Sequence, residues 1–242
     1  MLRIAMLTCL AMLAFAANSV LARLALAGGD ADALGYTGVR LAAGALMLGA
    51  ILALRREPGS PLRIDGSWSG AAALMGYALA FSLAYVMLGA GTGALILFAS
   101  VQIGMLVWAL QKRERPGSVE WLGFALAFAA LAFLVAPGLA APDPVGTVLM
   151  VAAGLSWAAY SLIGRSSRLP LADTAGNFIR CLPLSIVLVA MGMAIQTPTL
   201  AGLAYAVASG AIASGLGYAI WYSALPGLTR TGASFVQLTV PA

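Results

Sequence analysis

Residues 15–23 read FAANSVLAR, and residues 157–165, which lie 142 positions later, read WAAYSLIGR. The two segments match position by position, from an aromatic residue at the start to an arginine at the end. Three further pairs recur in the same order at separations of 133 to 140 residues, namely Arg40 with Arg180, Tyr85 with Tyr218, and Val101-Gln102 with Val236-Gln237. Near-constant separations in the same order indicate that the chain contains two copies of one unit.

Each copy is built from apolar segments long enough to cross a membrane. About 20 apolar residues span the hydrocarbon core of a bilayer. Eight segments qualify, namely Ile4–Ala22, Tyr36–Leu54, Ser69–Leu88, Gly93–Leu110, Val119–Ala136, Val145–Ile163, Ala175–Ile195 and Gly202–Leu225. A ninth apolar segment begins near Thr231 and has only 12 residues before Ala242, so we expect the chain to stop inside a helix. The repeat unit is therefore five helices.

The composition also indicates a lipid environment. Of the 242 residues, 62% are hydrophobic and 9% are charged, whereas soluble domains carry about 25% charged residues. The sequence predicts an all-α, polytopic transmembrane bundle of two five-helix repeats, one over residues 1–138 and one over residues 143–242. Ten helices are expected in the complete protein, and about eight and a half of them in this chain.

The basic residues predict the orientation of these helices. Ten of the 13 lie at the N-terminus or in the even-numbered loops, and only Arg23 lies in an odd-numbered loop. The positive-inside rule therefore predicts a cytoplasmic N-terminus in the plasma membrane, the inner membrane of a bacterium. The first segment resembles a signal peptide, but its recurrence in mid-chain argues against cleavage. Because five is odd, the second repeat is inverted, an arrangement typical of transporters with a site near the membrane midplane.

The chain lacks the residues that several other classes of protein need. The chain has no histidine, no P-loop motif, and no Asp or Glu in the middle of a predicted span. We therefore expect no cofactor or metal, no ATPase activity, and transport energy drawn from a gradient. The basic residues form no stripe that would bind nucleic acid. The expected partners are the lipid bilayer and a small-molecule substrate, and homodimer formation stays open.

Three stretches resemble a known family: ANSVLAR at 17–23, GTGALILF at 91–98 and ASFVQLTVP at 233–241. They are similar to the EamA family of the drug/metabolite transporter superfamily, and the resemblance extends over the whole chain. It implies ten helices in two inverted halves, with a central cavity lined mainly by spans one, three, four, six, eight and nine. Members often carry Trp where Phe15 stands, which leaves the aromatic role of that position open.

The expected function is secondary transport of small metabolites, with export of amino acids or related metabolites and drugs as the family-level expectation. A membrane scaffold that transports nothing is the alternative. An intramembrane enzyme is a weaker one, because the acids and histidines that such enzymes use are missing from the spans.

Polar side chains inside the spans are the candidates for the site, because such residues are costly in lipid. The candidate substrate-binding residues are Asn18, Tyr85, Gln102, Tyr160, Tyr218 and Gln237. Hydrogen bonds that only hold helices together, for about 1 kcal/mol each, are the alternative for each of them. Arg40 and Arg180 have two interpretations: each anchors its helix by snorkelling, or each guards one mouth of the pathway and attracts an anionic or zwitterionic substrate.

Overall fold

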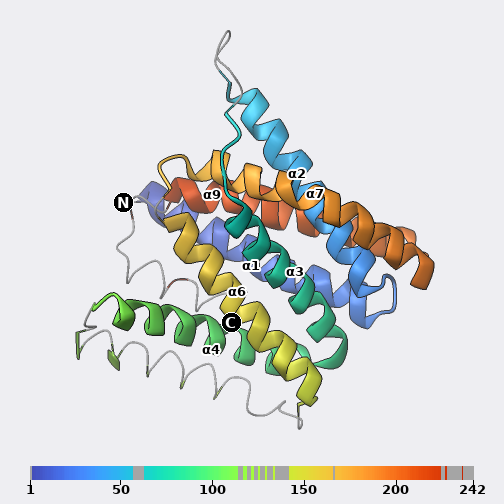
Figure 1. The fold of residues 1–242 in the computed structure, drawn as a ribbon, viewed down its shortest axis with the longest axis horizontal. Coiled ribbons are helices and arrows are strands. Elements are labelled where there is room, and N and C mark those ends of the chain that lie inside the picture. The colour runs from blue at the N-terminus through green and yellow to red at the C-terminus, as the bar shows by residue number, and fades with distance from the viewer. Residues whose placement is uncertain are drawn as a thin grey trace.

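The computed structural model describes residues 2–56, 63–113, 142–165 and 167–224, together with positions 117–118, 121–122, 125, 129, 133, 227 and 236. Within this part the chain is all-helical, and seven helices are long and apolar enough to cross a membrane (Figure 1). The predicted α-helical transmembrane bundle is thereby confirmed. Most of the predicted span Val119–Ala136, and nearly all of the segment from Thr231, lie outside the described residues.

The spans are α1 (Leu2–Ala27), α2 (Ala33–Leu54), α3 (Trp68–Met87), α4 (Ala90–Gln111), α6 (Pro144–Arg165), α7 (Pro170–Ile195) and a last span made of α8 (Leu200–Ala208), η2 (Ser209–Leu216) and α9 (Gly217–Ala224). Two bounds differ from the prediction by five residues. Helix α1 continues through Arg23 to Ala27, so this arginine lies inside the helix and not in a loop. Helix α7 begins at Pro170, since proline fits the first turn, where no backbone donor is required.

Polar residues at the helix starts satisfy backbone N–H groups that have no partner within the helix. The Asp32 carboxylate accepts hydrogen bonds from Leu34 N and Gly35 N at 2.8 and 3.0 Å, at the start of α2. Ser67, Asp143 and Thr199 accept equivalent bonds at the starts of α3, α6 and α8. These caps fix where each helix begins and therefore how deeply its side chains lie in the bundle.

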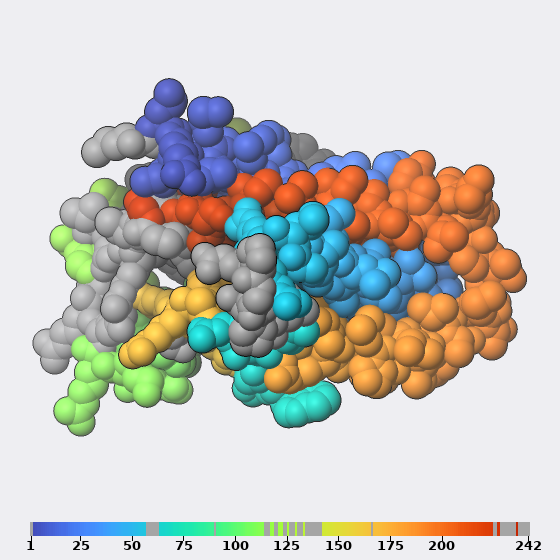
Figure 2. All heavy atoms as spheres, turned by 90° about the horizontal axis from the view of Figure 1, so that it is seen from above, coloured from blue at the N-terminus to red at the C-terminus, as the bar shows by residue number. Residues whose placement is uncertain are grey.

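The helices pack in the pattern that a two-fold relation between the repeats produces. The repeat pairs α1, α2 and α3 with α6, α7 and the α8–η2–α9 helix. Helix α2 packs most extensively against its own counterpart α7, while α3 packs against α6 and α1 packs against the α8–η2–α9 helix. Figure 2 shows the α9 region, in red, lying along α1, in dark blue. Contacts between the two repeats thus form the centre of the bundle.

Glycines bring the backbones of the two repeats close together at these contacts. A Cβ atom on Gly38 of α2 would lie 2.5 Å from the Ser185 carbonyl oxygen of α7. A Cβ atom on Gly154 of α6 would lie 2.5 Å from Cβ of Ser100 on α4. Because no larger residue fits at these positions without movement, they fix the spacing of the helices that surround the site.

Candidate substrate-binding cavity

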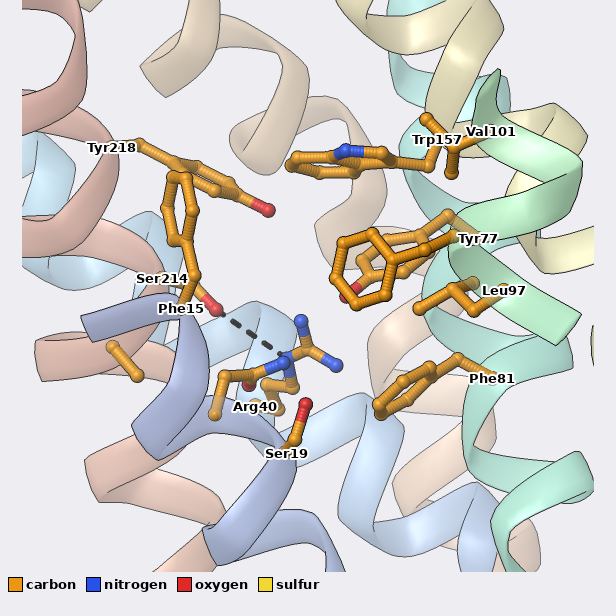
Figure 3. A pocket seen from close by; sticks show the side chains of 13 residues that line it. Phe15, Ser19, Arg40, Tyr77, Phe81, Leu97, Val101, Trp157, Ser214 and Tyr218 are labelled. Carbon is orange, nitrogen blue, oxygen red and sulfur yellow. Dashed lines mark hydrogen bonds between the residues drawn. The ribbon is translucent and has the colours of Figure 1, made fainter. Parts of the chain in front are cut away.

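A cavity lies between the two repeats (Figure 3). The side chains that line it come from α1, α2, α3, α4, α6 and the last span: Phe15, Asn18, Ser19, Arg40, Tyr77, Phe81, Leu97, Phe98, Val101, Trp157, Ala213, Ser214 and Tyr218. Phe81, which is among those nearest to a helix end, still precedes the last residue of α3, Met87, by six residues. At 1.5 Å per residue this places the lining roughly 9 Å or more from the helix ends.

Aromatic rings from both repeats form much of the cavity wall. The Trp157 ring lies 4.8 Å from the Tyr77 ring and 5.6 Å from the Tyr218 ring, measured between centroids. Phe15 meets the Tyr218 ring edge-on at 5.5 Å. Rings at these separations attract one another and offer flat, weakly polar surfaces to a ligand. The wall therefore suits a solute with an apolar or aromatic body.

Arg40 is the only charged residue among the described residues that line the cavity. Its side chain is 2% exposed, and its Nε donates a long hydrogen bond of 3.4 Å to Ser214 Oγ. The guanidinium carbon lies 5.5 Å from the Tyr77 ring centroid and 5.9 Å from that of Phe81. Within the part of the chain that the structure describes, its Nη1 has no hydrogen-bond partner. In Figure 3 the guanidinium extends into the space between Ser19, Tyr77 and Phe81.

The snorkelling interpretation of Arg40 is wrong. A snorkelling arginine lies on the lipid-facing side of its helix and reaches the interface. Arg40 instead lies seven residues inside α2, at the interface between repeats, with almost no surface exposed. It belongs to the wall of the cavity.

A π-helical segment in the last span contacts both the backbone and the side chain of Arg40. Residues Ser209–Leu216 form this segment between α8 and α9. A Cβ atom on Gly210 would overlap the Arg40 carbonyl oxygen, so the two backbones touch here. Ser214, one turn later, holds the Arg40 side chain. Short π-helical insertions are frequent at functional sites, because they redirect side chains within a continuous helix.

Two of the predicted substrate-binding residues, Asn18 and Tyr218, line the cavity. The Asn18 Oδ1 accepts a hydrogen bond of 2.5 Å from Ser209 Oγ, so this amide also joins α1 to the last span. Gln102 is half-buried and is not among the lining residues, whereas its neighbour Val101 is. Gln237 lies outside the described residues.

Tyr85 and Tyr160 lie behind the wall. Both are buried, and neither is among the residues that line the cavity. The Tyr85 ring packs on Phe81 at 4.3 Å, and the Tyr160 ring packs on Trp157 at 5.7 Å. They support two of the wall rings from outside.

Arg180 is placed differently from its repeat partner Arg40. It is half-buried, and its Nη1 donates a hydrogen bond to the Asp65 carbonyl oxygen at 2.5 Å. Its guanidinium carbon lies 6.0 Å from the Trp68 ring centroid. Arg180 thus holds the segment before α3 against α7, away from the cavity.

The sequence interpretation did not select five aromatic residues of the wall: Phe15, Tyr77, Phe81, Phe98 and Trp157. Two signals were present. Tyr77, Phe81 and Tyr85 recur at intervals of four and so share one face of a helix. Phe15 and Trp157 begin the repeated segment, and both occupy the cavity.

Comparison with known proteins identifies the family. The model of the EamA-like transporter family matches residues 2–136, more than half of the chain. The chain belongs to the EamA-like transporter family. The predicted family, part of the drug/metabolite transporter superfamily, is thereby confirmed, and the EamA-like chain is an integral membrane protein of a transporter family.

Two further similarities concern a bacterial relative and a solved structure. The EamA-like chain is 53% identical over 239 residues to the uncharacterized protein PA1977 of Pseudomonas aeruginosa, covering 99% of this chain and 83% of the relative. It also superimposes on a solved structure entitled only "Crystal structure of protein", with a TM-score of 0.73 and 17% identity over 98% of this chain and 84% of the other. That likeness concerns the fold alone.

Proposed function

We propose that this EamA-like protein is a secondary transporter that moves a small metabolite or drug through the cavity between its two repeats, residues 1–138 and 143–242. Export of an amino acid or a related metabolite is the direction and class we favour. The observation that carries the proposal is the cavity itself, which lies at mid-depth, is lined by both repeats and combines aromatic surface with an arginine, a serine pair and an asparagine. Inverted-repeat transporters bind their substrates in such a position.

A membrane scaffold would not require these features. A protein that only holds partners gains nothing from a central cavity, and closely packed side chains would stabilise it further. Several polar residues in the bundle are satisfied by packing contacts alone, such as Ser82, which accepts from Thr37 and donates to the Ala78 carbonyl oxygen. At the cavity, by contrast, Arg40 Nη1 has no hydrogen-bond partner among the described residues.

The proposed orientation places the N-terminus in the cytoplasm of a bacterial cell, with the protein in the inner membrane. The support is the excess of basic residues in the even-numbered loops. An impermeant thiol reagent added outside the cell should label a cysteine at Asp143 and not one at Arg56. The reverse labelling would contradict this orientation.

Filling the cavity should stop transport. Ala213 lines the cavity and is 1% exposed, while its neighbour Ile212 faces outward and is 57% exposed. Ala213→Phe places a ring where the solute would pass, and Ile212→Phe changes only the lipid-facing surface, so the two variants are a matched pair. Accumulation of labelled amino acids, amino-acid derivatives and aromatic acids would be measured in inside-out vesicles that contain equal amounts of folded protein.

We expect at least one solute to accumulate with the unmodified protein and with Ile212→Phe, and at least about tenfold less with Ala213→Phe. Monodisperse elution and the unfolding temperature in detergent would show that both variants fold. If no solute accumulates above the level of Ala213→Phe, the protein does not transport these compounds through the cavity and the proposal fails.

A further inference from the structure

Among the described residues, Arg40 has no ion-pair partner of the kind that a buried arginine ordinarily has. Arginine keeps its positive charge in proteins, and buried charges are normally paired or fully hydrogen-bonded. Its described contacts include one long hydrogen bond from Nε to Ser214, an electrostatic contact with the Tyr77 side chain, and the rings of Tyr77 and Phe81. No Asp or Glu is among the described residues that line the cavity. One positive charge therefore faces the cavity without a negative partner from its described lining.

The remaining wall limits what could neutralise this charge. One guanidinium offers two parallel N–H groups that match a carboxylate, whereas phosphate groups are usually bound by several cationic or backbone donors. The rings of Tyr77, Phe81, Trp157 and Tyr218 lie around the same space and provide surface for an apolar body.

We propose that Arg40 binds the carboxylate of an organic monoanion whose apolar or aromatic body lies against these rings, and that the cavity selects for anions over cations. The inference rests on the proposed transport function and narrows its substrate class. Arg40 Nη1, which has no hydrogen-bond partner among the described residues, is a donor available to the ligand. The described lining has no acid to bind an ammonium group, so the carboxylate is the group recognised.

The charge of the cavity can be measured without knowing the substrate. Ser19 is half-buried and lines the cavity, and a cysteine there would report on the ions that enter it. In a background with Cys9 and Cys181 replaced by alanine, we would compare how fast Ser19→Cys reacts with two thiol reagents of similar size. One is the anionic sulfonatoethyl methanethiosulfonate and the other is the cationic trimethylammonioethyl methanethiosulfonate.

We expect the anionic-to-cationic rate ratio to fall by at least about tenfold in Arg40→Gln, because a nearby charge acts strongly in a poorly solvated site. Arg40→Lys keeps the charge and should keep the ratio, which guards against misfolding of the glutamine variant. Arg180→Gln removes an equal charge away from the cavity and should leave the ratio unchanged. An unchanged ratio in Arg40→Gln, or an equal fall in Arg180→Gln, would overturn the proposal.

Protection from labelling tests the carboxylate itself. Acetate, phenylacetate, benzoate and indole-3-acetate would be compared with their amides and with inorganic phosphate, each present during the reaction with the neutral reagent methyl methanethiosulfonate. We expect the aromatic carboxylates to slow labelling at least about fivefold more than the amides, and Arg40→Lys to lose this difference because it lacks the planar fork. Equal protection by amides, or stronger protection by phosphate, would contradict carboxylate recognition.

Failure of this inference differs from failure of the proposed function. If carboxylates protect Ser19→Cys in an Arg40-dependent way but the protein moves no solute, the carboxylate site stands and the proposed transport function fails. If solute flux is the same in Arg40→Gln as in the unmodified protein, the transport function stands and the role of Arg40 in binding the solute fails.

Discussion

Gly210→Ala should destabilise the protein strongly and abolish transport. The added methyl group would overlap the carbonyl oxygen of Arg40, and its next neighbours are the Arg40 carbonyl carbon and Cβ of Ala43 at 2.8 and 2.9 Å. Backbone atoms cannot rotate away as a side chain does, so α2 and the π-helical segment must separate. Overpacking of this kind costs about 1–3 kcal/mol. It also moves Arg40 away from Ser214 and the aromatic rings.

Gly49→Ala is the matched control, because Gly49 lies on α2 itself and a Cβ atom there meets nothing within 4 Å. Thermal unfolding in detergent, followed by tryptophan fluorescence, would be measured for both variants together with solute flux. Alanine favours a helix over glycine by up to about 1 kcal/mol, so Gly49→Ala should unfold at or above the temperature of the parent. Equal unfolding temperatures for the two variants would show that α2 and the last span do not touch at Gly210.

Trp157→Ala should lower solute flux at least about tenfold, which corresponds to about 1.4 kcal/mol of lost binding or transition-state stabilisation. The Trp157 ring contacts Tyr77, Tyr160 and Tyr218 and forms the side of the cavity contributed by α6. Its removal takes away a surface that the solute would contact, and it also allows the neighbouring rings to move into the vacated space. Trp157→Phe keeps a smaller ring and should recover part of the flux.

Val148→Ala controls for shortening a side chain on the same helix, since Val148 is 68% exposed and faces lipid. Initial rates of flux, divided by the amount of protein in the membrane, would be compared over a range of solute concentrations. The aromatic wall has no role in transport if Trp157→Ala stays within twofold of Val148→Ala.

The sequence predicts the spans of this protein well because two independent physical patterns agree. Apolar length and the basic residues between spans define where each helix crosses the membrane. The repeated segment then relates α1 to α6, and both of its aromatic residues, Phe15 and Trp157, lie in the cavity. A repeated motif can be recognised from the sequence alone, although the contacts that its residues make cannot.

The side chains that form the wall are harder to predict. Tyr77 and Phe81 are apolar enough for lipid contact, helix packing or a binding site, and the sequence does not separate these roles. Gln102 was selected for its amide group, but one residue turns a helix by 100°, and its neighbour Val101 faces the cavity instead. Arg40 was expected near the interface because the spans alone do not show which face of α2 meets the other repeat.

The π-helical segment shows a further limit. Prediction from regular helical spacing assumes 3.6 residues per turn, and residues Ser209–Leu216 depart from it. Ser209 and Ser214 thereby reach Asn18 and Arg40 respectively. Within this segment Gly210 also lies against the Arg40 backbone, a contact between residues 170 positions apart in the sequence.

Transport through the proposed site requires that the cavity between the repeats open in turn to the two sides of the membrane. Its most direct test is the labelling of Ser19→Cys, in a background without Cys9 and Cys181, by an impermeant charged thiol reagent added to either face of sealed vesicles. Ala17→Cys, whose parent residue is exposed on the outer surface of the same helix, is the lipid-facing control. We expect Ser19→Cys to react from both faces, each reaction to stop solute flux, and Ala17→Cys to react from neither. Reaction of Ser19→Cys from one face only, or from none, would contradict alternating access through this cavity.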